Sequence, residues 1–214
     1  MATLLRVDAS IRTEGSVSRA VADSAVAAWS REHPDGAVAR RDLGTSPLPA
    51  DMWARAVHAR RVDEADRTAD QRDALALVSV LASELLDADA LVLASPLYNF
   101  GVSQHTKAWI DLIITDPRLG PGTTALQGKP ALLVVTQGGG YREGAPRHGW
   151  DHSTGYLERI LGDNFGMELH SVVADLTLAS VTPAMAHLVD AAEQSLATAH
   201  EQAARHGADL AVAV

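Results

Sequence analysis

Residues 90–100 decide the fold of this chain, and they read Ala-Leu-Val-Leu-Ala-Ser-Pro-Leu-Tyr-Asn-Phe. The first five residues form a short, continuously apolar run, which is typical of a strand buried on both faces of a parallel sheet. A rigid proline, two aromatic side chains and an amide follow at once. The stretch therefore predicts a central strand with a chemically distinctive loop at its carboxyl end.

The same pattern extends outward in both directions as an alternation of strands and helices. Further apolar runs predict strands at 4–8, 37–43, 131–135 and 171–174. Helical spacing predicts helices at 18–33, 52–62, 154–161 and 183–205. Another helix begins with a Thr-x-x-Gln capping box at 68–71, and a further one follows the loop at 95–101 and ends near residue 114. Short alternating connections favour right-handed crossovers and a parallel sheet covered on both faces. We expect a single domain over residues 1–214.

Composition excludes several classes of function. The 214 residues are 47% hydrophobic and 21% charged, which suits one globular domain, and they include no cysteine for a thiolate or a disulfide. A net charge of −9 opposes binding to nucleic acid. The N-terminus lacks a leader pattern, and no apolar run approaches membrane-spanning length. We therefore expect a cytoplasmic protein with no nucleic-acid or membrane partner.

Three loops follow strands at the predicted carboxyl edge of the sheet, where doubly wound folds bind ligands. Residues 10–18 are rich in hydroxyls and lead into a helix N-terminus that favours a phosphate, although plain capping by Ser16 or Ser18 explains this loop better when it is taken alone. Residues 95–101 suit one face of a planar heterocycle and suit aromatic closure of the core equally well. Residues 136–141 contain three glycines that let a ligand approach the backbone, but alone they fit a simple turn.

Taken together, and with the pattern Lys107-x-Trp109-Ile110-Asp111, these loops resemble the FMN-dependent NAD(P)H azoreductase and quinone reductase family of flavodoxin-like proteins. The resemblance implies a flavodoxin-like three-layer α/β sandwich whose five-stranded parallel sheet has the order 2-1-3-4-5. It also implies that Lys107 and Asp111 are structural. The implied FMN contacts are Ser10, Ser16, Val17 and Ser18 at the phosphate, Pro96, Leu97, Tyr98, Asn99 and Phe100 at the ring, and Thr136, Gln137, Gly138 and Gly139 at its pyrimidine side.

The resemblance further implies an enzyme that transfers hydride from NADH or NADPH through FMN to a quinone or azo-type acceptor in a ping-pong reaction. Tyr141 and His148 are candidates to contact the acceptor or donate a proton. His148 and His152 are four residues apart but lack a third ligand, so we expect no metal. The family implies a homodimer, with residues 52–62 as a wall of the partner's site. A flavodoxin-type electron carrier and a non-catalytic ligand-binding module remain the alternatives.

Overall fold

A five-stranded parallel sheet with the order β2-β1-β3-β4-β5 forms the centre of the computed structural model, which describes residues 1–212. This is the predicted topology, and all five predicted strands are present. Their bounds are β1 (Thr3–Asp8), β2 (Ala37–Asp42), β3 (Ala90–Pro96), β4 (Pro130–Thr136) and β5 (Glu168–Ala174). As predicted, β3 is central and buried along its whole length.

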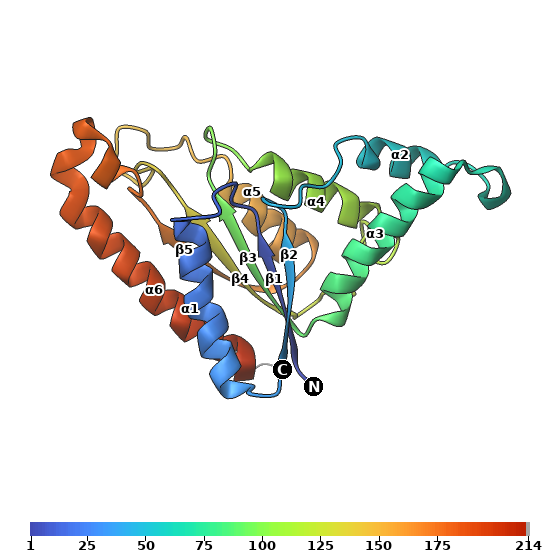
Figure 1. Cartoon of the computed structure of the whole chain (residues 1–214), viewed down its shortest axis with the longest axis horizontal. Helices are drawn as coiled ribbons and strands as arrows, with labels where there is room; N and C mark the ends of the chain where they lie inside the picture. The colour runs from blue at the N-terminus through green and yellow to red at the C-terminus, as the bar shows by residue number, and fades with distance from the viewer. Residues whose placement is uncertain (213–214) are drawn as a thin grey trace.

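Helices cover both faces of this sheet (Figure 1). On one face lie α1 (Val17–Glu32) and α6 (Val189–Val212), which pack against each other and against the strands. The other face carries α3 (Ala69–Asp87), α4 (Gln104–Thr115) and α5 (Thr154–Glu158). The short helix α2 (Met52–Ala59) packs on α3 and α4. The layers are therefore helix, sheet and helix.

Local sequence signals explain where several helices begin. The capping box before α3 is formed, because the Thr68 hydroxyl accepts the Gln71 N–H and the Gln71 side chain accepts the Thr68 N–H. The predicted helix at 183–205 is wrong at both ends. Residues Pro183–Leu188 form a 3₁₀ turn, a common connector, before α6 begins at Val189. The helix then continues to Val212 because its second half packs closely on α1, with Gly207 against the Ala25 backbone.

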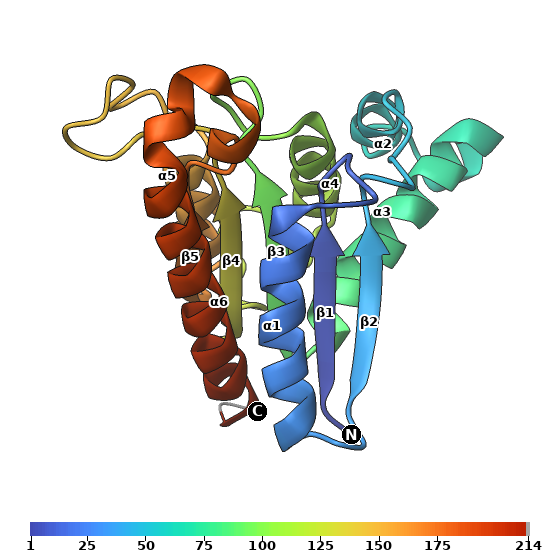
Figure 2. The same cartoon turned by 60° about the vertical axis from the view of Figure 1, so that its left-hand side comes forward.

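The two ends of the sheet carry different parts of the chain. The loops after β1, β3 and β4 gather at one end, whereas β1 begins and α6 ends at the opposite end (Figure 2). No helix among residues 1–212 combines the length and apolar character needed to cross a membrane. A ligand site is therefore expected at the end of the sheet where these three loops meet.

Candidate functional site

A cavity of about 170 Å³ opens between the loops that follow β1, β3 and β4. In the sheet, β2 lies on one side of β1 and β3 lies on the other, so the strand order reverses at β1. Doubly wound folds bind ligands at this reversal point, beyond the carboxyl ends of the strands. The cavity is lined by Ser10, Arg12, Ser16, Val17, Ser18, Pro96, Leu97, Tyr98, Thr136, Gly138, Thr177 and Leu178. All three loops selected from the sequence contribute to it.

The β1–α1 loop presents an uncapped helix N-terminus to this cavity. Ser16 is the N-cap residue of α1, yet its side chain makes no capping hydrogen bond. Its hydroxyl instead lies 3.3 Å from the Ser18 hydroxyl, and both residues are buried. The capping alternative is therefore wrong. Within residues 1–212, no side chain accepts a hydrogen bond from the first N–H groups of α1. Free N–H groups at a helix N-terminus, together with the helix dipole, favour binding of an anion.

The loop after β3 is a tight turn with a strained backbone. Tyr98 and Gly101 exchange hydrogen bonds, with N–O distances of 3.2 and 3.0 Å. Asn99 and Phe100 between them have φ values of 48° and 68°, in the left-handed region that costs a bulky side chain about 1–3 kcal/mol. The Tyr98 hydroxyl accepts the Ile11 N–H at 3.3 Å. This turn is therefore fixed in shape and tied to the β1–α1 loop.

Phe100 joins the same turn to the long loop after β4. Its ring makes T-shaped contacts with Trp150, with centroids 5.2 Å apart, and with Tyr141, with centroids 6.3 Å apart. The Arg147 guanidinium lies 5.4 Å from the Phe100 ring centroid. The Phe100 carbonyl also accepts the His152 N–H at 2.9 Å. These contacts over-determine the strained conformation, as is common at ligand sites.

The carbonyl groups of the glycine loop after β4 are bonded to the segment after β5. The segment after β5 donates to the carbonyls of Gln137 (3.0 Å), Gly138 (3.1 Å) and Gly139 (3.3 Å). Within residues 1–212, the N–H groups of Gly138 and Gly139 donate no hydrogen bond. Gln137 is held separately, because its amide donates to Asp151 at 2.7 Å. The N–H groups of Gly138, which lines the cavity, and of its neighbour Gly139 are therefore available to a ligand.

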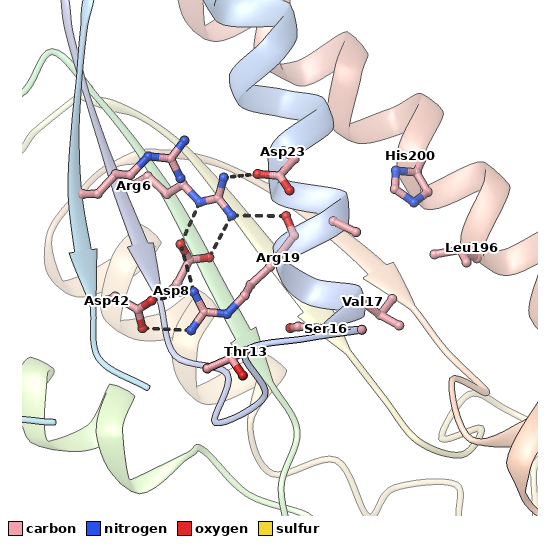
Figure 3. Close-up of a pocket in the computed structure, with 13 residues that line it drawn as sticks. Arg6, Asp8, Thr13, Ser16, Val17, Arg19, Asp23, Asp42, Leu196 and His200 are labelled. Carbon is pink, nitrogen blue, oxygen red and sulfur yellow. Dashed lines mark hydrogen bonds and ion pairs between the residues drawn. The ribbon is translucent and has the colours of Figure 1, made fainter. Parts of the chain in front are cut away.

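A second cavity, of about 520 Å³, lies behind the β1–α1 loop over a charged network (Figure 3). Arg6 is 2% exposed and donates to both Asp8 oxygens at 2.8 and 3.1 Å, and it also bonds Asp23. Arg19 donates two bonds to Asp42 at 2.6 and 2.8 Å. These bonds raise the pKa of Arg19 and hold the pKa of Asp42 well below its usual range. Because the charges satisfy one another, the first cavity is the better ligand site.

The structure places the two candidate proton donors differently. Tyr141 is partly buried and lines a third cavity, of about 700 Å³, beside β5 and α6. His148 is exposed and lines none of the cavities described. Asp151 precedes α5, and its carboxylate accepts the Ser153 and Thr154 N–H groups at 2.8 and 2.9 Å. Within residues 1–212, no cluster of three potential metal ligands is present.

Three lining residues escaped the sequence reasoning. Arg12 lies within residues 10–18, where the predicted phosphate contacts are Ser10, Ser16, Val17 and Ser18. Thr177 and Leu178 follow β5, and their position after the carboxyl end of a strand is a signal that would have found them. Lys107 and Asp111, which the resemblance implies are structural, form an ion pair along α4, with an N–O distance of 2.5 Å.

Comparisons with known proteins agree with this geometry. Residues 2–206 match the model of a family described by its flavodoxin-like fold. The chain is 39% identical to an "FMN-dependent NADH:quinone oxidoreductase" of Streptomyces avermitilis, over 99% of this chain and 98% of that relative. It is 35% identical to a relative of the same description from Streptomyces coelicolor, over 98% and 96% of the two chains. An azoreductase structure from Bacillus anthracis superposes with a TM-score of 0.79 and 25% identity, over 98% of this chain and all of that one. The chain therefore belongs to the flavodoxin-like family that contains these quinone oxidoreductases.

Proposed function

We propose that this chain is an FMN-dependent NAD(P)H oxidoreductase that reduces quinone or azo-type acceptors. The observation that carries the proposal is the three-loop cavity, which joins an uncapped helix N-terminus to unpaired backbone donors of the glycine loop. The descriptions of the relatives name FMN, NADH and quinones and support the same assignment. When bound, FMN supplies the hydride chemistry, and donor and acceptor use it in turn in a ping-pong sequence.

The residues of the β1–α1 loop fit the phosphate of FMN. The N–H groups at the start of α1 supply backbone donors, and the hydroxyls of Ser10, Ser16 and Ser18 supply side-chain donors. Val17 contributes its backbone, so a polar side chain is not needed there. Arg12, which lines the cavity, adds positive charge. These groups suit a phosphate without a lysine.

The other two loops fit the ring. The turn formed by residues 96–100 would lie along one side, because its fixed backbone and its tie to the β1–α1 loop make it a rigid wall. The N–H groups of Gly138 and Gly139 would donate to the pyrimidine edge, where they stabilise negative charge on the ring. Thr136 lines the cavity on this side, and Gln137 supports the loop by donating its side-chain amide to Asp151. The protein's part in the reaction is therefore to bind, orient and stabilise charge.

The size of the cavity supports a homodimer. A cavity of about 170 Å³ is smaller than the roughly 300–1,000 Å³ of typical cofactor sites, so a flavin ring would extend over open surface. The exposed large apolar side chains include Ile11 (60%), Trp53 (49%) and Trp150 (52%). We infer that a second copy covers them, with residues 52–62 as a wall. Analytical ultracentrifugation should give a dimer for the wild type and a weaker one for Trp53→Glu, and a wild-type monomer would contradict the inference.

Tyr141 is the better placed of the two candidate proton donors. Its ring packs against Phe100, whereas His148 lies on an exposed part of the loop. Replacing Tyr141 by Phe keeps this packing and removes only the hydroxyl. If the hydroxyl donates the proton, quinone turnover falls while FMN affinity stays the same. Unchanged turnover in both Tyr141→Phe and His148→Gln would remove the two residues from the mechanism.

The decisive experiment is anaerobic addition of NADH to the FMN-loaded protein, followed by a soluble quinone. The visible flavin absorbance should be lost with NADH and return with the quinone, without any partner protein. A flavin that NADH cannot reduce would identify an electron carrier instead, and a protein that does not bind FMN would identify a different ligand-binding module. We also propose that residues 1–214 form one FMN-binding domain and that the protein acts in the cytoplasm.

A further inference from the structure

The side chain of Arg19 holds the β1–α1 loop from behind. Its Nη2 donates to the Ser10 carbonyl at 2.9 Å, and its Nε donates to the Arg12 carbonyl at 3.1 Å. The same guanidinium forms a fork with Asp42 at the end of β2 (Figure 3). We call this group, made of Arg19, Asp42 and the carbonyls of Ser10 and Arg12, the loop clamp. It connects α1, β2 and the loop in one set of hydrogen bonds.

Asp42 is itself fixed by the turn that follows β2. One of its oxygens accepts the N–H groups of Gly44 and Thr45, at 3.1 and 3.0 Å. Asp8 and Asp42 are also register partners in the parallel pair β1–β2, so two carboxylates stand side by side at the end of the sheet. Arg19 lies between them, 3.7 Å from Asp8. The arginine is therefore held in place by two strands.

The loop clamp determines where a backbone donor points. In a trans peptide the C=O and the following N–H point in opposite directions. Because Arg19 draws the Ser10 carbonyl to its own side, the Ile11 N–H faces the other way, where it meets the Tyr98 hydroxyl on the cavity wall. Arg19 lines the charged cavity behind the loop but not the three-loop cavity. It thus acts on the ligand site through the loop.

We propose that Arg19, held by Asp42, is a positioning residue that sets the β1–α1 loop for the phosphate group of FMN without touching it. This inference rests on the proposed function. It predicts a defect specific to phosphate: the protein without the clamp should lose affinity for FMN and keep its affinity for riboflavin, which has the ring and side chain but no phosphate. A purely structural role would weaken both flavins equally.

The test is fluorescence titration of the flavin-free protein with FMN and with riboflavin. Arg19→Lys keeps the charge but loses the fork, and FMN affinity should fall about 10- to 100-fold, the loss expected for a misplacement near 1 Å, with riboflavin affinity changing less than about threefold. The matched control is Arg41→Lys. Arg41 forms a similar fork with Glu84 from the same strand, away from the loop, so this variant should bind both flavins as the wild type does.

A second variant separates geometry from charge. Asp42→Asn weakens the fork but makes the site more positive, so the loop clamp predicts weaker FMN binding whereas simple charge attraction predicts stronger binding. It also carries the test if Arg19→Lys does not fold. Equal losses for the two flavins, unchanged FMN binding in Arg19→Lys, or tighter FMN binding in Asp42→Asn would each overturn the inference. A wild-type protein that binds neither flavin would overturn the proposed function and this inference with it.

Discussion

Replacing Gly44 by Ala should disturb the candidate site from a distance. A Cβ at this position would lie 1.9 Å from the Ser10 carbonyl oxygen and 2.6 Å from its carbon. Real Cβ atoms essentially never come closer than 3.0 Å to another heavy atom, so the two backbones must separate by about 1 Å. No flexible side chain can absorb this change, because the obstacle is backbone.

The cost of that separation follows from the contacts it breaks. Overpacking typically costs about 1–3 kcal/mol. The bonds at risk are Leu43 N–H to Asp8 carbonyl at 2.8 Å and Arg19 to Ser10 carbonyl at 2.9 Å, each contributing about 1 kcal/mol. Overpacking together with the loss of one of these two bonds should therefore lower the free energy of unfolding by about 2–4 kcal/mol. For a chain of this length, that lowers Tm by about 4–16 °C.

Thermal unfolding followed by circular dichroism, with and without FMN, measures this effect. We expect the lower Tm together with weaker FMN binding, because the displaced Ser10 lines the cavity. Gly155→Ala in α5 is the matched control, since nothing lies within 4 Å of its Cβ position, its φ is not positive and it does not line the cavity. A Gly44→Ala protein that melts and binds FMN as the wild type does would refute the reasoning.

Three further predictions concern the packing around the site. Gly207→Ala should lower the free energy of unfolding by about 1–2 kcal/mol, because a Cβ 2.2 Å from the Ala25 carbonyl oxygen causes a steric clash. The cost of this clash exceeds the roughly 1 kcal/mol gain in helix propensity. Urea unfolding measures the difference, and a variant more stable than the wild type would contradict the prediction. Lys129→Met should destabilise the protein by about 1–3 kcal/mol, because the Lys129 Nζ donates to three carbonyls at the end of α3. Urea unfolding measures this too, and an unchanged free energy of unfolding would show that these bonds do not stabilise the protein. Burial, with a contribution from the stacked His170, lowers the pKa of His206 in the folded protein. The neutral form of His206 therefore stabilises the protein fully above pH about 6.5, and this stability is lost as the pH falls toward the lower folded pKa. Tm should fall over this pH range in the wild type and fall less in His206→Gln, and equal pH profiles of the two proteins would exclude His206 as the cause.

The sheet could be predicted from the sequence because its signals are local. The strands β3 and β4 contain the continuous apolar runs 90–94 and 131–135, and burial on both faces leaves only one compatible environment for them. The capping box at Thr68 fixes a helix start through contacts three residues apart. Residues 183–188 were harder, because a proline starts both α- and 3₁₀-turns and only packing decides between them.

The candidate site could be predicted in outline but not in its supporting contacts. Loops at the carboxyl ends of strands are visible in sequence, and nine of the predicted cofactor residues line the cavity, from Ser10 to Gly138. The loop clamp depends on the register that sets Asp8 beside Asp42, and on the side of α1 from which Arg19 reaches them. Those facts come from long-range packing. No spacing of residues along the chain encodes them.

The separation between the loops and the ends of the chain bears on how the protein can be used. Thr3 begins β1, and α6 ends at Val212, at the end of the sheet opposite the ligand cavity (Figure 2). A purification tag, a fused protein or a surface attached at either end would project away from the cavity. Immobilised on an electrode or a bead through these ends, the protein would keep the cavity's mouth turned toward the solution.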